Sequence, residues 1–144
     1  MQVDFYQLSR DPAESALAMI ADKALETGER LLVVSADDAQ LARISEALWS
    51  RKGSFLAHGA VGGPHEERQP ILLSDRVEPA NAARFVVFAD GEWRDEGLKF
   101  ERVFLLFDGS TIDQARATYR MLDGRDDVQR RYFKQEEGKW ITAA

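Results

Sequence analysis

Apolar residues along this chain fall into two patterns, short continuous runs and stripes that recur every three or four positions. Four runs between turn residues are typical of buried strands, because a strand covered on both faces carries few polar side chains. These runs occupy residues 31–34, 71–73, 85–88 and 103–107. Residues 3–8 alternate and are rich in strand-forming types, which predicts a further strand at the start of the chain.

Three stripes with helical spacing lie between or after these strands. The first follows Asp11, which we expect to cap a helix, and ends at Gly28. The second occupies residues 37–49 and begins at one of two consecutive aspartates. The third begins at Thr111, which has the spacing of a capping box with Gln114. The sequence therefore predicts three helices, each with one apolar face.

The remaining segments are less regular. Residues 53–69 are rich in glycine and predict a long loop. The third helix ends near Gly124 or resumes through Tyr132, and residues 133–144 have room for a short terminal strand. The alternation of strands and helices predicts one α/β domain over residues 1–144, a mostly parallel central sheet with helices on both faces in a Rossmann-like three-layer sandwich.

Composition narrows the protein class. The 144 residues suit one domain, because domains average about 150 residues. The absence of cysteine excludes disulfides, thiolate metal sites and cysteine nucleophiles. No stretch approaches the roughly 18 apolar residues of a membrane span, and the first residues lack the basic and apolar regions of a signal peptide. We therefore expect a cytoplasmic protein with no membrane partner.

Charge is unevenly distributed along the chain. The net charge is −6, yet residues 114–134 hold six Lys and Arg against three Asp, so this segment is +3 and the rest is −9. An acidic chain is repelled by a phosphate backbone, so we expect no direct binding to DNA. A basic segment on an acidic body suits an acidic peptide. The alternative is an ordinary solvated helix face.

The sequence contains no strong cofactor or metal motif. Neither type of glycine-rich phosphate loop follows a strand, so no nucleotide cofactor is expected. His58 and His65 lie in the glycine-rich loop near Glu66 and Glu67. A metal site needs three or four convergent ligands, and two loop histidines are more typical of solvated residues. We therefore expect no resident metal.

Two aspartates offer an enzymatic alternative. Asp90 and Asp108 each follow a predicted strand and precede a glycine. The carboxyl ends of parallel strands are where α/β enzymes place catalytic groups, but Asp-Gly is also a common turn. The alternative function is a small metal-dependent α/β enzyme or receiver-like domain that uses these two carboxylates.

Two groups of residues are candidates for binding other proteins. Arg116, Tyr119 and Arg120 have the spacing that places them on one helix face. Guanidinium groups bind carboxylates through paired hydrogen bonds, and the ring offers apolar contact; the alternative is a core-edge tyrosine with solvated arginines. Trp49 and Phe55 flank a short glycine-containing turn and are either core residues or an exposed anchor for a partner.

Taken in order, these segments resemble the chi subunit family of bacterial DNA polymerase III. The resemblance is carried by residues 4–8, 46–49, 54–59, 69–73, 81–83, 107–109 and 115–119. It extends from about Val3 to Trp140, and residues 132–140 resemble the alphaproteobacterial branch.

The resemblance implies an α/β fold without bound nucleotide and a non-catalytic accessory subunit of the replicative polymerase. Such subunits bind the acidic C-terminal tail of single-stranded DNA-binding protein and join the clamp loader through the psi subunit. By correspondence, Arg116, Tyr119 and Arg120 would bind the tail. Trp49 and Phe55 would bind psi or an alternative helicase partner.

One position departs from the family pattern. Better-known members have a lysine one turn before the first arginine of the tail-binding helix, and this chain has Ile112 there. Either the tail binds less tightly or another cation, such as Arg125, takes the place of the lysine.

Overall fold

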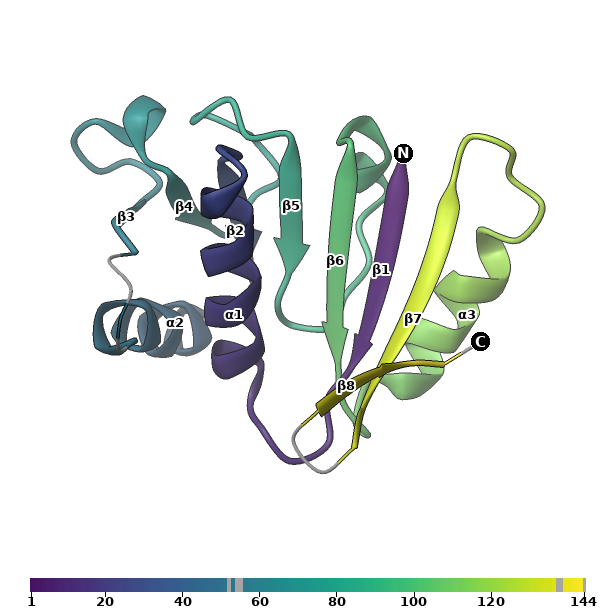
Figure 1. The fold of residues 1–144 in the computed structure, drawn as a ribbon. Helices are drawn as coiled ribbons and strands as arrows, with labels where there is room; N and C mark the ends of the chain where they lie inside the picture. Colours follow the sequence, from purple (N-terminus) through teal and green to yellow (C-terminus); the bar gives the residue numbers. More distant parts are fainter. Residues whose placement is uncertain (52, 54–55, 137–138, 144) are drawn as a thin grey trace.

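The computed structural model describes residues 1–51, 53, 56–136 and 139–143, and its core is one eight-stranded sheet (Figure 1). The strands lie in the order β3-β4-β2-β5-β6-β1-β7-β8, and all neighbours are parallel except β7 and β8. They are β1 (Gln2–Gln7), β2 (Leu31–Val34), β3 (His58–Ala60), β4 (Ile71–Ser74), β5 (Phe85–Phe88), β6 (Arg102–Phe107), β7 (Gln129–Glu136) and β8 (Lys139–Thr142).

Three helices cover the two faces of this sheet. Helices α1 (Ala13–Glu26) and α2 (Asp38–Ser50) pack on one face, and α3 (Ile112–Met121) packs on the other. Two short 3-10 helices, η1 (Glu66–Arg68) and η2 (Asp95–Lys99), lie in the connections. The predicted α/β class with a mostly parallel sheet between helical layers is confirmed. No helix among the described residues is long and apolar enough to cross a membrane.

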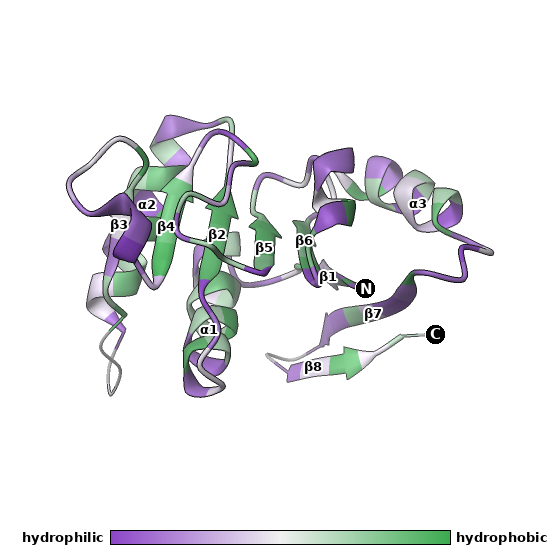
Figure 2. Cartoon of the chain, turned by 90° about the horizontal axis from the view of Figure 1, so that it is seen from above, coloured by the Kyte–Doolittle hydropathy of each residue, from purple (hydrophilic) through white to green (hydrophobic). Residues whose placement is uncertain are grey.

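Alternation along the strands divides the core into two layers. Val3 and Phe5 of β1 pack on the α3 side, and Tyr6 packs on the α1 side. Leu32 of β2 likewise faces the α3 side while Val33 faces α1. Both faces of these central strands are buried, which is why their sequence is an almost continuous apolar run. Figure 2 shows the same contrast, with hydrophobic β2 and β5 and a largely hydrophilic β7.

The helix starts agree only in part with the expected caps. Asp37 caps α2, accepting a hydrogen bond from the Ala39 N–H at 3.0 Å. Asp11 does not cap α1; its carboxylate accepts from Gln135 Nε2 at 2.7 Å. Thr111 makes no capping bond to α3, because its hydroxyl oxygen accepts a backbone N–H in the preceding turn at 3.1 Å. The expected capping box is therefore wrong.

The largest difference between the predicted and the observed structure lies in the C-terminal region. The suggested resumption of the third helix through Tyr132 is wrong, because this residue lies in β7, which pairs with β1. In that register Arg130 and Tyr132 share one face of the sheet and Arg131 shares the other with Phe133. The expected terminal strand is present as β8. The segment 53–69, expected to be a loop, contains β3 and η1.

Candidate functional site

A groove of about 380 Å³ lies between α3 and β7. Its lining consists of Gln7, Arg116, Tyr119, Arg120, Tyr132, Lys134 and Ala143. Three of these side chains come from the face of α3 that helical spacing predicted, and two come from β7. The structure therefore brings Arg116, Tyr119 and Arg120 together at one concave surface.

Aromatic packing fixes the floor of this groove. The Tyr119 ring contacts Phe5 edge-on, with centroids 5.1 Å apart, and contacts Tyr132 with centroids 5.8 Å apart. Tyr119 is half-buried, so it takes part in the core and also lines the groove. The structure confirms the interpretation of Tyr119 as a residue at the edge of the core, and its role in binding stays a prediction. Its place in the core means that a ligand meets a ring already held in position.

Arg130 holds the same tyrosine from another side. Its guanidinium carbon lies 4.1 Å from the Tyr119 ring centroid, and its Nη1 donates to the Tyr119 carbonyl oxygen at 2.6 Å. Its Nη2 forms an ion pair with Asp123 at 2.8 Å. Arg130 is therefore a structural cation, and its charge is balanced within the chain.

The basic segment separates into paired and solvent-facing cations. Arg125 pairs with Asp127 at 3.1 Å, Arg130 pairs with Asp123, and Arg131 pairs with Asp4. The remaining three, Arg116, Arg120 and Lys134, are exposed and form no ion pair with a carboxylate in the described part of the chain. All three line the groove, so the local positive charge is concentrated there.

Tyr132 links the two walls of the groove. Its hydroxyl donates to Gln7 Oε1, and the positive charge of Arg116 acts to lower its pKa. Burial raises the pKa of Tyr132, and Arg116 offsets only part of that rise. The hydroxyl therefore stays protonated at neutral pH.

Lys134 is the cation of this groove that the sequence did not assign to the site. It lies on β7 and reaches the site only because β7 pairs with β1. Arg125, the expected substitute for the missing family lysine, pairs with Asp127 and does not line the groove. Ile112 packs against the core on the α3 side. An apolar floor with three cations suits a peptide that carries carboxylates and an apolar residue.

A second concave surface, of about 470 Å³, lies between α2 and β3. These two elements are at the opposite end of the sheet from α3 (Figure 1). Trp49 lines it and is 56% exposed, with its ring centroid 4.5 Å from that of His58. His58 Nε2 and Ser45 Oγ are 2.7 Å apart. Trp49 is thus an exposed aromatic residue, as a partner anchor requires. Phe55, its expected companion, lies outside the described residues.

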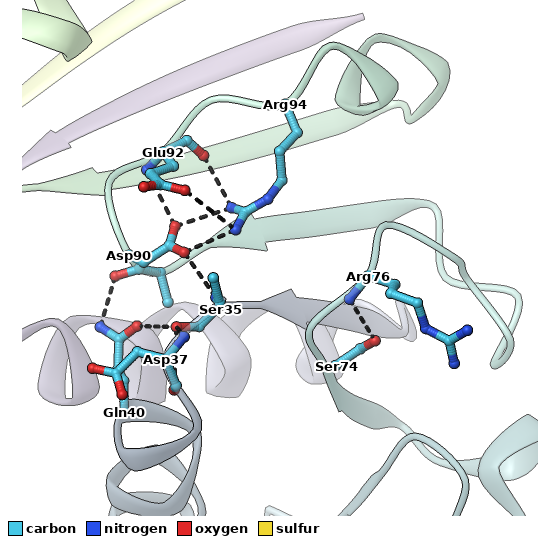
Figure 3. A network of polar contacts seen from close by, with 10 residues as sticks. Ser35, Asp37, Gln40, Ser74, Arg76, Asp90, Glu92 and Arg94 are labelled. Atoms are coloured by element: carbon cyan, nitrogen blue, oxygen red, sulfur yellow. Dashed lines mark hydrogen bonds and ion pairs between the residues drawn. The ribbon is translucent and has the colours of Figure 1, made fainter.

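Asp90 and Asp108 line a third cleft, of about 460 Å³, at the carboxyl ends of the central strands. Arg94 holds the Asp90 carboxylate at 2.8 Å (Figure 3), and the Ala36 N–H donates to it at 2.9 Å. Burial acts to raise the pKa of Asp90, but Arg94 and two backbone N–H groups lower it below the usual value. The Ser110 hydroxyl donates to Asp108 at 2.6 Å and lowers its pKa.

These contacts make both aspartates part of well-formed turns. Within the described residues, no group of three or more His, Asp or Glu side chains has the arrangement of a metal site. His58 bonds to Ser45 and to the Leu56 carbonyl oxygen, so one of the two loop histidines has a structural role.

Comparison with known proteins gives one family. The family model described as DNA polymerase III chi subunit, HolC, matches residues 1–127. No curated protein matches the chain. The matched range includes all of α3, whereas β7 and its groove residues Tyr132 and Lys134 lie beyond it.

Proposed function

This chain belongs to the DNA polymerase III chi subunit family, and on that premise we propose that it links the clamp loader to single-stranded DNA-binding protein. Membership of this family makes the protein an accessory subunit of DNA polymerase III. In our proposal the acidic C-terminal tail of single-stranded DNA-binding protein lies in the groove between α3 and β7. The subunit acts by binding and has no catalytic site or cofactor of its own.

The observation that carries this proposal is the grouping, around an aromatic floor, of three exposed cations that form no ion pair with any carboxylate among the described residues. Arg116 lines the groove together with Tyr119 and Tyr132, and its charge acts on the Tyr132 hydroxyl. It is suited to the terminal carboxylate or an acidic side chain of the tail, while Tyr119 contacts the tail's last apolar residue. Arg120 and Lys134 supply further positive charge from the two walls.

The charge of the whole chain supports an acidic peptide over nucleic acid. The net charge is −6, and duplex binding needs several cations that neutralise phosphates along an extended path. Three groove cations suffice for a short tail with a few carboxylates. Contact with DNA is therefore indirect, through the single-stranded DNA-binding protein, and the place of action is the cytoplasmic, nucleoid-associated replisome.

A titration of the isotope-labelled protein with a synthetic tail peptide, followed by NMR, tests this proposal. We expect the amide signals of α3 and β7 to shift, with those of α2 unchanged. A peptide of the same composition in scrambled order, with an amidated C-terminus, is the control and should cause much smaller shifts. Shifts confined to α2, or equal shifts with both peptides, would contradict the tail site.

The clamp-loader connection is assigned in our proposal to the Trp49 surface. The partner is the psi subunit or another clamp-loader or helicase protein. An exposed tryptophan beside a cavity is a typical interface anchor. Trp49→Ala should abolish capture of the purified clamp loader but leave the tail peptide affinity unchanged. Ile141→Ala, which removes another exposed apolar side chain, on β8, is the matched control. An equal loss of clamp-loader capture in both variants would contradict the assignment of the Trp49 surface to this partner.

A further inference from the structure

A row of aromatic rings crosses the sheet on the side opposite the α3 groove. In order from β8 to β5 the rings are Trp140, Phe133, Tyr6, Phe104 and Phe85. Tyr6 lies 5.1 Å from Trp140, 4.9 Å from Phe133 and 6.1 Å from Phe104, measured between centroids. Phe104 lies 6.2 Å from Phe85. On this side of the sheet α1 packs beside β2 and β6, and β8 lies near β7 (Figure 2).

A row of charges runs beside the rings. Asp4 is fully buried and accepts from Arg102 Nη2 at 2.6 Å and from Arg131 Nε at 3.0 Å. The guanidinium carbon of Arg102 lies 4.5 Å from the Phe104 ring centroid, and that of Arg131 lies 5.3 Å from the Phe133 centroid. One carboxylate is thus shared by two guanidinium groups that remain 29% and 47% exposed. The cluster carries an excess positive charge.

A small groove opens where this cluster meets α1. Its volume is about 130 Å³, and it is lined by Tyr6, Phe85, Phe104, Arg102 and one side of α1 that includes Lys23. Lys23 is exposed and forms no ion pair within the part of the chain that the structure describes. With Lys23, the charge at this groove reaches +2. The volume corresponds to about four water molecules at ~30 Å³ each, so it admits one medium-sized side chain.

We propose that this Arg102 groove is a second peptide-binding surface, for an acidic segment that inserts one aliphatic side chain between α1 and the sheet. The inserted side chain contacts Phe85 and Phe104, and flanking carboxylates pair with Arg102 and Lys23. The guanidinium groups of Arg102 and Arg131 each still have N–H groups not used by Asp4. The surface is independent of the α3 groove, which lies on the other face of the sheet.

Charge and ring exposure favour a peptide over single-stranded nucleic acid. Base stacking needs open ring faces, but Tyr6 and Phe104 are buried at the centre of the row. The acidic chain as a whole repels a polyanion, whereas a peptide with two or three carboxylates is balanced by the local +2.

The test measures binding of an end-blocked, fluorescein-labelled peptide, Asp-Asp-Leu-Asp-Asp, to two charge-reversal variants. Both variants also carry Arg116→Ala, which is expected to weaken binding of the peptide to the α3 groove. Lys23→Glu changes the Arg102 groove, and Lys99→Glu makes the same change in net charge on η2. We expect Lys23→Glu to weaken the affinity at least fivefold relative to Lys99→Glu, with NMR shifts on α1 and β6.

Equal affinities of the two variants, or shifts confined to α3 and β7, would overturn the proposal. Binding of oligo(dT) that depends on Lys23, without comparable peptide binding, would instead identify a nucleic-acid surface and also overturn it. Both charge reversals are at exposed positions, and circular dichroism confirms that each variant is folded before binding is compared.

Discussion

Replacing Arg116 with alanine should weaken tail binding about 30-fold or more and leave the fold intact. The side chain is exposed in the free protein, so its removal takes no apolar group from the core. In the complex the tail would exclude water from this guanidinium. Loss of one partner of a desolvated, hydrogen-bonded charge pair costs about 2–5 kcal/mol, and about 1.4 kcal/mol corresponds to a tenfold change in Kd.

Two neighbouring arginines provide the comparison. Arg120 is exposed on the groove wall, so Arg120→Ala should cost about 1 kcal/mol or less and mainly reduce the salt dependence. Arg125 lies outside the groove and pairs with Asp127. Arg125→Ala removes the same charge, so it measures how much of the effect is long-range attraction. We expect its Kd to remain within about twofold of wild type, because salt screens charges beyond about 8–10 Å.

Fluorescence anisotropy of a labelled tail peptide, at about 50 and 150 mM salt, gives the three affinities. If Arg116→Ala binds as tightly as wild type or Arg125→Ala, the assignment of α3 as the tail site is wrong. A second readout tests the local geometry without any ligand. Because Arg116 lowers the pKa of Tyr132, Arg116→Ala should raise that pKa further in an NMR titration. An unchanged value would refute the contact.

The remaining predictions concern the opposite groove wall, the core and the cleft. Lys134→Ala should weaken the affinity for the tail peptide several-fold in the anisotropy assay, and an effect no larger than that of Arg125→Ala would exclude Lys134 from the site. Asp4→Ala should destabilise the fold by about 3 kcal/mol in urea unfolding, because it leaves two guanidinium groups unpaired; a loss below about 1 kcal/mol would contradict this. Burial raises the pKa of Tyr6 and Tyr132 above 10.0, so the folded chain keeps protons that the unfolded chain releases, and stability should fall as the pH rises above about 10. Tyr132→Phe should reduce that fall, and an identical pH profile in both proteins would argue against it. A magnesium titration monitored by tryptophan fluorescence should show no saturable site in the cleft at the ends of β5 and β6, whereas saturation would favour the enzymatic alternative.

The strands buried on both faces were predictable because burial itself produces the apolar run. Residues 31–34 and 85–88 coincide with β2 and β5 for this reason. The α3 face was predictable as well, since helical spacing is local and needs no knowledge of distant segments. Sequence reasoning therefore found one wall of the groove, including Arg116.

The other wall depended on a long-range pairing that no local pattern shows. β7 is rich in long polar side chains, and only its place beside β1 makes it a strand. Lys134 could not be assigned to the groove without that pairing. The helix caps predicted at Asp11 and Thr111 were wrong for a related reason, because each side chain forms its hydrogen bond with a group other than the N-terminus of its helix. A polar side chain can form hydrogen bonds with several alternative partners, and which of these bonds forms depends on the tertiary structure.

Because β1 lies between β6 and β7, this part of the sheet can form only after both of these later strands have been synthesised. β1 is made first, yet its neighbours in the sheet begin at Arg102 and Gln129. The strand therefore leaves the ribosome long before either partner exists, and such distant pairings slow folding and leave apolar surface open to aggregation. The groove, whose walls are α3 and β7, forms only when the last of these segments docks. If the tail binds in this groove as proposed, a chain that ends before β7 should not compete for it.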